Sequence, residues 1–253
     1  MAKGKAPKVG EAAPAVASML GCVLIDKAAG QIGFVIDGIS LTGGDLSDVA
    51  DALVAGRIAI HVWKHASVSL ARYENGPNRL VVPRRFRNVQ ELSLRDSGLV
   101  VHEGVHAAFD LRSQKLQKLM DEACAYVAQL VYCKLWKVYG FKGSVALAAA
   151  DVADYILSQP KAKAPGGVVV PETILSPLKE AIKADPLYAD WADQMNYNGI
   201  PAARAPEPAA RPAHRPTPVG HPKQSHHSKA FKHGAVSPSH ADVFRTPGVY
   251  GVA

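Results

Sequence analysis

Cysteine is scarce in this sequence, and the glycines follow no regular spacing. Only three cysteines occur among 253 residues. Cys124 and Cys133 fall in one expected helix, where a rise of about 1.5 Å per residue puts them roughly 13 Å apart, too far for a disulfide. We therefore expect reduced thiols rather than a disulfide scaffold. Because glycine has no three-residue period and no heptads persist, a collagen and a coiled coil are excluded as well.

Long apolar runs are also missing. The two longest, residues 12–25 and 145–157, are interrupted by proline and by aspartate respectively. A membrane-spanning helix needs about 20 consecutive apolar residues. We therefore expect no transmembrane segment.

The start of the chain resembles a secretion signal only in part. Lys3, Lys5 and Lys8 precede an apolar run, as in the first region of a signal peptide. Glu11 and Pro14 interrupt that run. We expect the protein to be cytoplasmic, or to be delivered elsewhere without a cleavable signal peptide.

Positive charge is concentrated near the C-terminus. The formal net charge is +7, and residues 201–253, with seven basic and two acidic residues, carry +5 of it. The same segment holds nine of the 18 prolines and six of the 10 histidines. It has too few apolar residues to fold, so we expect a disordered Pro/His-rich basic tail after a single domain, residues 1–200. Such a tail allows weak contact with acidic partners or nucleic acid.

The order of expected elements predicts an α+β fold. Strands are expected first and helices after them, which is the pattern of that class. The expected strands are residues 57–63, 67–73 and 79–82, with a turn at Asn75-Gly76-Pro77. The expected helices are residues 45–56, 92–109, 114–139, 144–157 and 172–184.

The most informative segment is His102-Glu103-Gly104-Val105-His106. Two histidines four residues apart on a helix project from the same face, so both imidazoles can bind one zinc ion, while Glu103 can reach a water on that ion. The alternative is that these polar residues are simply paired within the core. Gly104 costs roughly 0.8–1 kcal/mol relative to alanine inside a helix. Close backbone packing and substrate approach both remain open as its explanation.

This HExxH pattern resembles the zincin superfamily of zinc metallopeptidases. The resemblance implies one zinc ion per chain, with His102 and His106 as ligands and Glu103 as the general base. A catalytic zinc usually takes a third protein ligand. Metzincins take it from a histidine further along the motif, but Phe109 and Arg112 stand at the relevant positions.

The gluzincin branch instead takes a glutamate from the following helix, which implies Glu122. Helix geometry favours the same residue. If the chain reverses just after residue 110, His102 and Glu122 lie at the same height in an antiparallel pair. Asp121 points about 100° away from that side. Asp110 is either a ligand, as in aspartate-type zincins, or, as we favour, a helix-end group that orients His106 through the ring nitrogen away from the metal.

The expected reaction is hydrolysis of a peptide or protein substrate. Zinc lowers the pKa of its bound water toward about 7, and Glu103 accepts the proton and passes it to the leaving amine. A strand such as residues 79–82 either forms a sheet edge that binds substrate as an added strand or lies inside the sheet. The donor to the oxyanion is left open among Tyr73, Tyr126, Tyr132 and His65.

Three other functions remain open. The first is a non-catalytic zinc-containing binding protein that recruits acidic partners through its tail. A purely structural zinc site needs no carboxylate such as Glu103 beside an open coordination position, and this separates the first alternative from a hydrolase. The second is an exported toxin or effector with a protease-like domain. The third is a basic nucleic-acid binder in which the motif is a coincidence and no metal is bound.

Overall fold

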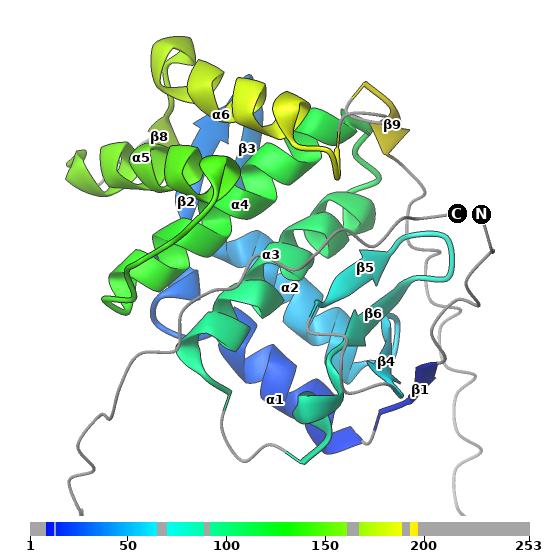
Figure 1. The fold of residues 1–253 in the computed structure, drawn as a ribbon. Coiled ribbons are helices and arrows are strands. Elements are labelled where there is room, and N and C mark those ends of the chain that lie inside the picture. The colour runs from blue at the N-terminus through cyan, green and yellow to red at the C-terminus, as the bar shows by residue number, and fades with distance from the viewer. Residues whose placement is uncertain are drawn as a thin grey trace, which may run out of the picture. The chain divides into compact units, whose positions relative to one another are not determined.

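Helices and small sheets both occur in the chain, which confirms the α+β class (Figure 1). The structure, a computed structural model, describes residues 9–12, 14–64, 70–88, 92–160, 167–188 and 193–196. All of these residues belong to one compact unit. The expected tail and His65 lie outside the described residues.

The helices and strands of the described residues have the following bounds. The helices are α1 (Pro14–Leu24), α2 (Gly43–Val54), α3 (Leu94–Leu111), α4 (Lys118–Leu135), α5 (Ser144–Ser158) and α6 (Glu172–Ala184), with 3-10 helices η1 (Ala29–Gln31) and η2 (Arg84–Asn88). The strands are β1 (Val9–Glu11), β2 (Gly33–Ile36), β3 (Ile39–Thr42), β4 (Ala59–Trp63), β5 (Arg72–Glu74), β6 (Arg79–Val82), β7 (Leu116–Gln117), β8 (Val168–Val169) and β9 (Met195–Asn196). No helix of these stretches is long and apolar enough to cross a membrane.

Three helices begin at residues other than those expected: α2, α4, and α3, which begins at Leu94 rather than at residue 92. α2 begins at Gly43 because Thr42 caps it: the Thr42 N–H donates to the Asp45 carboxylate at 2.7 Å, while the Thr42 side chain accepts from the Asp45 backbone. α4 begins at Lys118 rather than at residue 114. Of the intervening residues, Leu116–Gln117 form β7, which pairs antiparallel with β9.

The largest sheet has the strand order β1-β4-β6-β5. β5 and β6 form an antiparallel hairpin around the expected turn, and β6 also pairs in parallel with β4. β6 therefore lies inside the sheet, so the alternative that residues 79–82 form a sheet edge is wrong. Among the described strands, the edge on this side is β5, which contacts α3.

Helix α3 is the central element of the fold. α1 and α2 pack against it, and α4 pairs with it as a helical hairpin that in turn contacts α5 and α6 (Figure 1). A Cβ atom at Gly104 would lie 2.7 Å from Leu24 Cδ2 and 3.4 Å from Leu46 Cδ2. Close packing of α3 against α1 and α2 therefore explains why glycine stands at this position.

Candidate metal centre

The site lies on the part of α3 that has no solvent-facing side. Ser93 caps the helix by accepting a hydrogen bond from the Asp96 N–H, and every residue from 100 to 110 is buried. Buried polar groups cost free energy unless they are paired. Four of these eleven residues are histidine, glutamate or aspartate, so each of them needs a partner from a neighbouring element.

The helical hairpin brings His102, His106 and Glu122 together. The chain reverses between α3 and α4, where Ser113 adopts a φ of 53°. Glu122 Oε2 lies 3.4 Å from His102 Nε2, and Glu122 Oε1 lies 3.6 Å from His106 Nε2. One ligand atom from each of the three side chains lies within 4.8 Å of the other two. The three residues that the sequence spacing predicted as ligands therefore lie close together.

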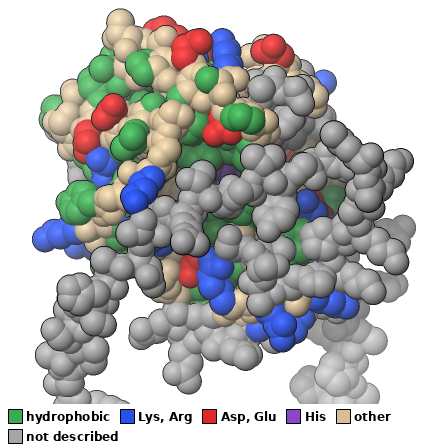
Figure 2. All heavy atoms as spheres, viewed as in Figure 1, with side chains coloured by type: hydrophobic (Ala, Val, Ile, Leu, Met, Phe, Trp, Pro, Cys, Tyr) green, Lys and Arg blue, Asp and Glu red, His purple; other side chains and the backbone are tan. Residues whose placement is uncertain are grey.

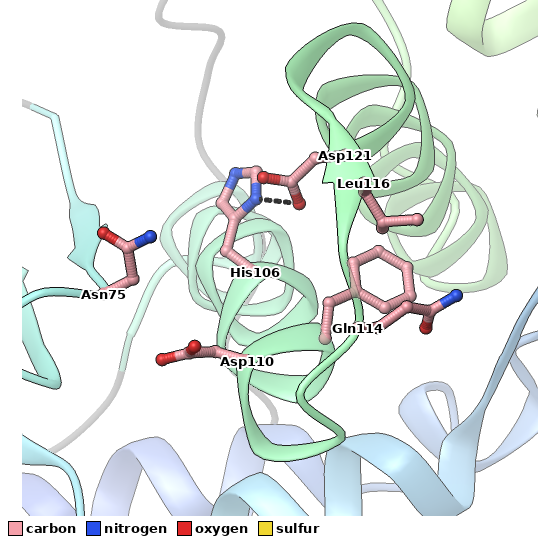
Figure 3. Close-up of a pocket in the computed structure, with 7 residues that line it drawn as sticks. Asn75, His106, Asp110, Gln114, Leu116 and Asp121 are labelled. Carbon is pink, nitrogen blue, oxygen red and sulfur yellow. Dashed lines mark hydrogen bonds and ion pairs between the residues drawn. The ribbon is translucent and has the colours of Figure 1, made fainter. Parts of the chain in front are cut away.

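The outer nitrogen of each imidazole has its own oxygen partner. His102 Nδ1 lies 3.2 Å from Gln129 Oε1, and His106 Nδ1 lies 2.6 Å from Asp121 Oδ1 (Figure 3). A hydrogen on Nδ1 satisfies these oxygens and leaves both Nε2 lone pairs directed at the same small volume. This is the arrangement by which metal-ligating histidines are usually oriented.

Asp121, not Asp110, is the carboxylate on the His106 ring. Figure 3 shows Asp121 beside the imidazole, whereas Asp110 points the other way, toward Asn75. Asp110 instead accepts a hydrogen bond from the Tyr73 hydroxyl at 2.6 Å. The expectation that Asp110 orients His106 is therefore not met, because a residue of the facing helix already occupies that nitrogen.

Lys118 brings a positive charge to the cluster from the first turn of α4. Its Nζ lies 3.1 Å from Glu122 Oε1 and 3.2 Å from Asp121 Oδ2. Burial alone would raise the pKa of Glu122, but the positive charges of His106 and Lys118 outweigh it and hold that pKa well below its usual range. Burial lowers the pKa of His106, yet the charge of Asp121 raises it overall. In the metal-free chain these positive charges therefore favour the ionised form of the Glu122 carboxylate.

Glu103 is held by the edge of the sheet. Its side chain is buried, and Glu103 Oε2 accepts a hydrogen bond from the main-chain N–H of Tyr73 at 2.6 Å. Tyr73 belongs to β5, so the middle of the motif is tied directly to the edge strand.

Two phenols border the site beside His102. The Tyr126 ring meets the His102 ring edge-on, with centroids 4.8 Å apart, and its hydroxyl lies 2.7 Å from that of Tyr188. Burial and then the charge of Glu122 raise the pKa of both phenols, which keeps them protonated. Sequence reasoning missed Tyr188, which follows α6. Tyr132, another expected donor to the oxyanion, instead donates to Asp26 at 2.7 Å.

The donor set could hold a metal ion, with its three ligand atoms within 4.8 Å of one another. Ligand atoms about 2.0–2.1 Å from a tetrahedral zinc lie roughly 3.3 Å from one another. The two distances from Nε2 to the Glu122 carboxylate are close to this value. Two imidazoles and one carboxylate also form one of the ligand sets of catalytic zinc.

The imidazoles retain a narrow opening to solvent. His102 and His106 are each 7% exposed. In the space-filling view, a histidine side chain is visible near the middle of the face, among hydrophobic side chains (Figure 2). A small pocket beside His106 is lined by Asn75, His106, Phe109, Asp110, Gln114, Leu116 and Asp121.

Comparisons of this chain with protein-family models, with curated proteins and with solved structures found no match. A functional conclusion therefore depends on the geometry of the site itself.

Proposed function

We propose that this chain is a zinc-dependent metallopeptidase that hydrolyses peptide bonds. The observation that carries the proposal is the convergence of three ligand atoms from His102, His106 and Glu122 within 4.8 Å. Each imidazole is oriented through its outer nitrogen, by Gln129 and by Asp121. A core that needed only paired polar groups would not require both inner nitrogens to face one carboxylate.

The residues of the chain have distinct tasks in this reaction. When bound, zinc acts as a Lewis acid that polarises a peptide carbonyl and lowers the pKa of a water molecule toward about 7. Glu103, next to His102 on the same helix, accepts the proton of that water and passes it to the leaving amine. The Tyr126 hydroxyl, whose ring meets that of His102, and the Tyr188 hydroxyl beside it are the candidates to donate to the oxyanion.

A second candidate function is zinc binding without turnover. One observation favours it: the ammonium of Lys118 already pairs with Glu122, one of the three ligand residues. The two candidates differ in what Glu103 does. A hydrolase needs its carboxylate to exchange protons, whereas a metal-binding protein does not.

The test combines metal analysis with a peptide-cleavage assay. We expect purified wild-type protein to hold one equivalent of zinc and to cleave a mixture of internally quenched peptides. Glu122→Ala should lose the zinc, and Glu103→Gln should keep it while losing hydrolysis. The matched control is Glu180→Gln, an exposed glutamate on α6 that pairs with Lys183.

Each possible failure has a separate meaning. Zinc retained undiminished in Glu122→Ala would show that Glu122 is not the third ligand. Zinc bound normally but no cleavage in the wild type would favour zinc binding without turnover, whereas equal cleavage in Glu103→Gln would show that Glu103 is not the general base. A chain without zinc would contradict both functions.

A further inference from the structure

Strand β5 contacts α3 through one residue that makes two hydrogen bonds. The Tyr73 N–H donates to Glu103 Oε2 and the Tyr73 hydroxyl donates to Asp110 Oδ2, both at 2.6 Å. Glu103 and Asp110 are seven residues apart, which is about two helical turns, so they lie on the same face of α3. Tyr73 therefore holds two side chains of the same face of α3, about two helical turns apart.

The Tyr73 N–H points away from the partner strand β6. Tyr73 lies opposite Leu80 in the antiparallel ladder with β6. In such a ladder, the N–H of alternate residues points away from the partner strand. Because the Tyr73 N–H donates to Glu103, it is one of these outward groups, and the β5–β6 ladder does not depend on it.

We propose that the main-chain N–H of Tyr73 positions the Glu103 carboxylate for proton transfer, which makes β5 a working part of the catalytic site. The inference rests on the proposed hydrolase function. A glutamate side chain has three rotatable bonds, and this one is buried at 6% exposure, where an unpaired carboxylate would be costly. The N–H satisfies Oε2 and leaves Oε1 to accept a proton from water.

A consequence concerns how an extended substrate is bound. Peptides that add to a sheet edge pair with its outward N–H and C=O groups. At Tyr73 the outward N–H is already occupied by Glu103. A substrate beside β5 therefore obtains no donor at this residue, and its pairing with the strand is weaker there.

The kinetic test compares two substitutions at the same position. Tyr73→Ala loses the phenol and keeps the N–H, whereas Tyr73→Pro loses both and removes no ladder hydrogen bond. Since a misplacement of about 1 Å can cost on the order of 100-fold in rate, we expect kcat of Tyr73→Pro to fall about 10- to 100-fold below that of Tyr73→Ala. KM and zinc content should differ less than about threefold between the two variants, because neither substitution removes a residue that binds zinc or substrate. Equal kcat values in the two variants would overturn the inference.

Two further measurements keep the test decisive. If Tyr73→Pro does not fold, an ester in place of the amide before residue 73 removes the same N–H and leaves the tyrosine side chain intact, and it should lower kcat in the same way. Independently of activity, exchange of the Tyr73 amide hydrogen should be slow in wild type and in Tyr73→Phe, and at least about tenfold faster in Glu103→Ala. Unchanged exchange in Glu103→Ala would overturn the positioning inference by itself. Absence of hydrolysis in the wild type would instead overturn the proposed function, and the inference with it.

Discussion

The carboxylate that orients His106 provides the sharpest test of the site. Asp121 is 1% exposed and its Oδ1 lies 2.6 Å from His106 Nδ1. Asp110 is one turn from His106 on the same helix, but it accepts from Tyr73 instead. Replacement of each by asparagine keeps the size of the side chain and removes its charge, so the two variants are matched.

The expected magnitude follows from what each residue contacts. Loss of an outer partner of a metal-bound histidine typically costs about 10- to 100-fold in metal affinity, which corresponds to about 1.4 to 2.7 kcal/mol. Asp121→Asn should fall toward the upper end of this range. The substitution weakens the hydrogen bond to His106. It also removes the charge of one of the two carboxylates, Asp121 and Glu122, that pair with Lys118. Asp110→Asn should change zinc affinity less than about threefold.

The assay is a competition between the protein and a chromophoric zinc chelator at pH 7. Thermal unfolding of the metal-free proteins should be measured in parallel, so that a loss of affinity can be separated from a loss of fold. An equal loss of affinity in the two variants, or a larger loss in Asp110→Asn, would refute the assignment of Asp121.

Three other predictions concern stability and reactivity. Gly104→Ala should lower the free energy of unfolding in urea by about 1 kcal/mol: overpacking against Leu24 costs about 1–3 kcal/mol, and the gain in helix propensity returns roughly 0.8–1 kcal/mol of it. The metal-free chain should be most stable between about pH 4 and pH 6.5, as measured by urea midpoints. The lowered pKa values of Asp121 and Glu122 contribute stability that is lost as the pH falls through them, whereas the raised pKa of His106 contributes stability that is lost as the pH rises through it. A thiol reagent should modify one of three cysteines rapidly in the native protein, since Cys22 is exposed, while Cys124 and Cys133 are buried and burial raises the pKa of Cys133 to about 12.

Much of the site could be predicted because helical periodicity is local. α6 and β6 have the expected bounds, and the spacing around the hairpin placed Glu122 opposite the two histidines. The β2–β3 hairpin was missed although its signal is present. Asp37-Gly38 is a favoured two-residue turn, and Phe34, Ile36, Ile39 and Leu41 are its buried residues.

The remaining features depend on contacts between distant segments. Asp121 was expected to point away from the metal, yet its short side chain reaches the outer edge of His106 from the neighbouring stripe of α4. Strand order decides that β5 rather than β6 is the edge, and a strand's own sequence does not encode its order in the sheet. Tyr188 joins the site only because the segment after α6 returns to α4.

The ammonium of Lys118 affects whether the chain can fold without a metal ion. Many small zinc domains unfold when their ion is withdrawn, because isolated negative charges are left behind in a dry interior. Here Lys118 serves as a built-in counterion for Asp121 and Glu122. Under the proposed function, we therefore expect the chain to fold before it meets a metal ion and to keep its architecture when a chelator removes the ion.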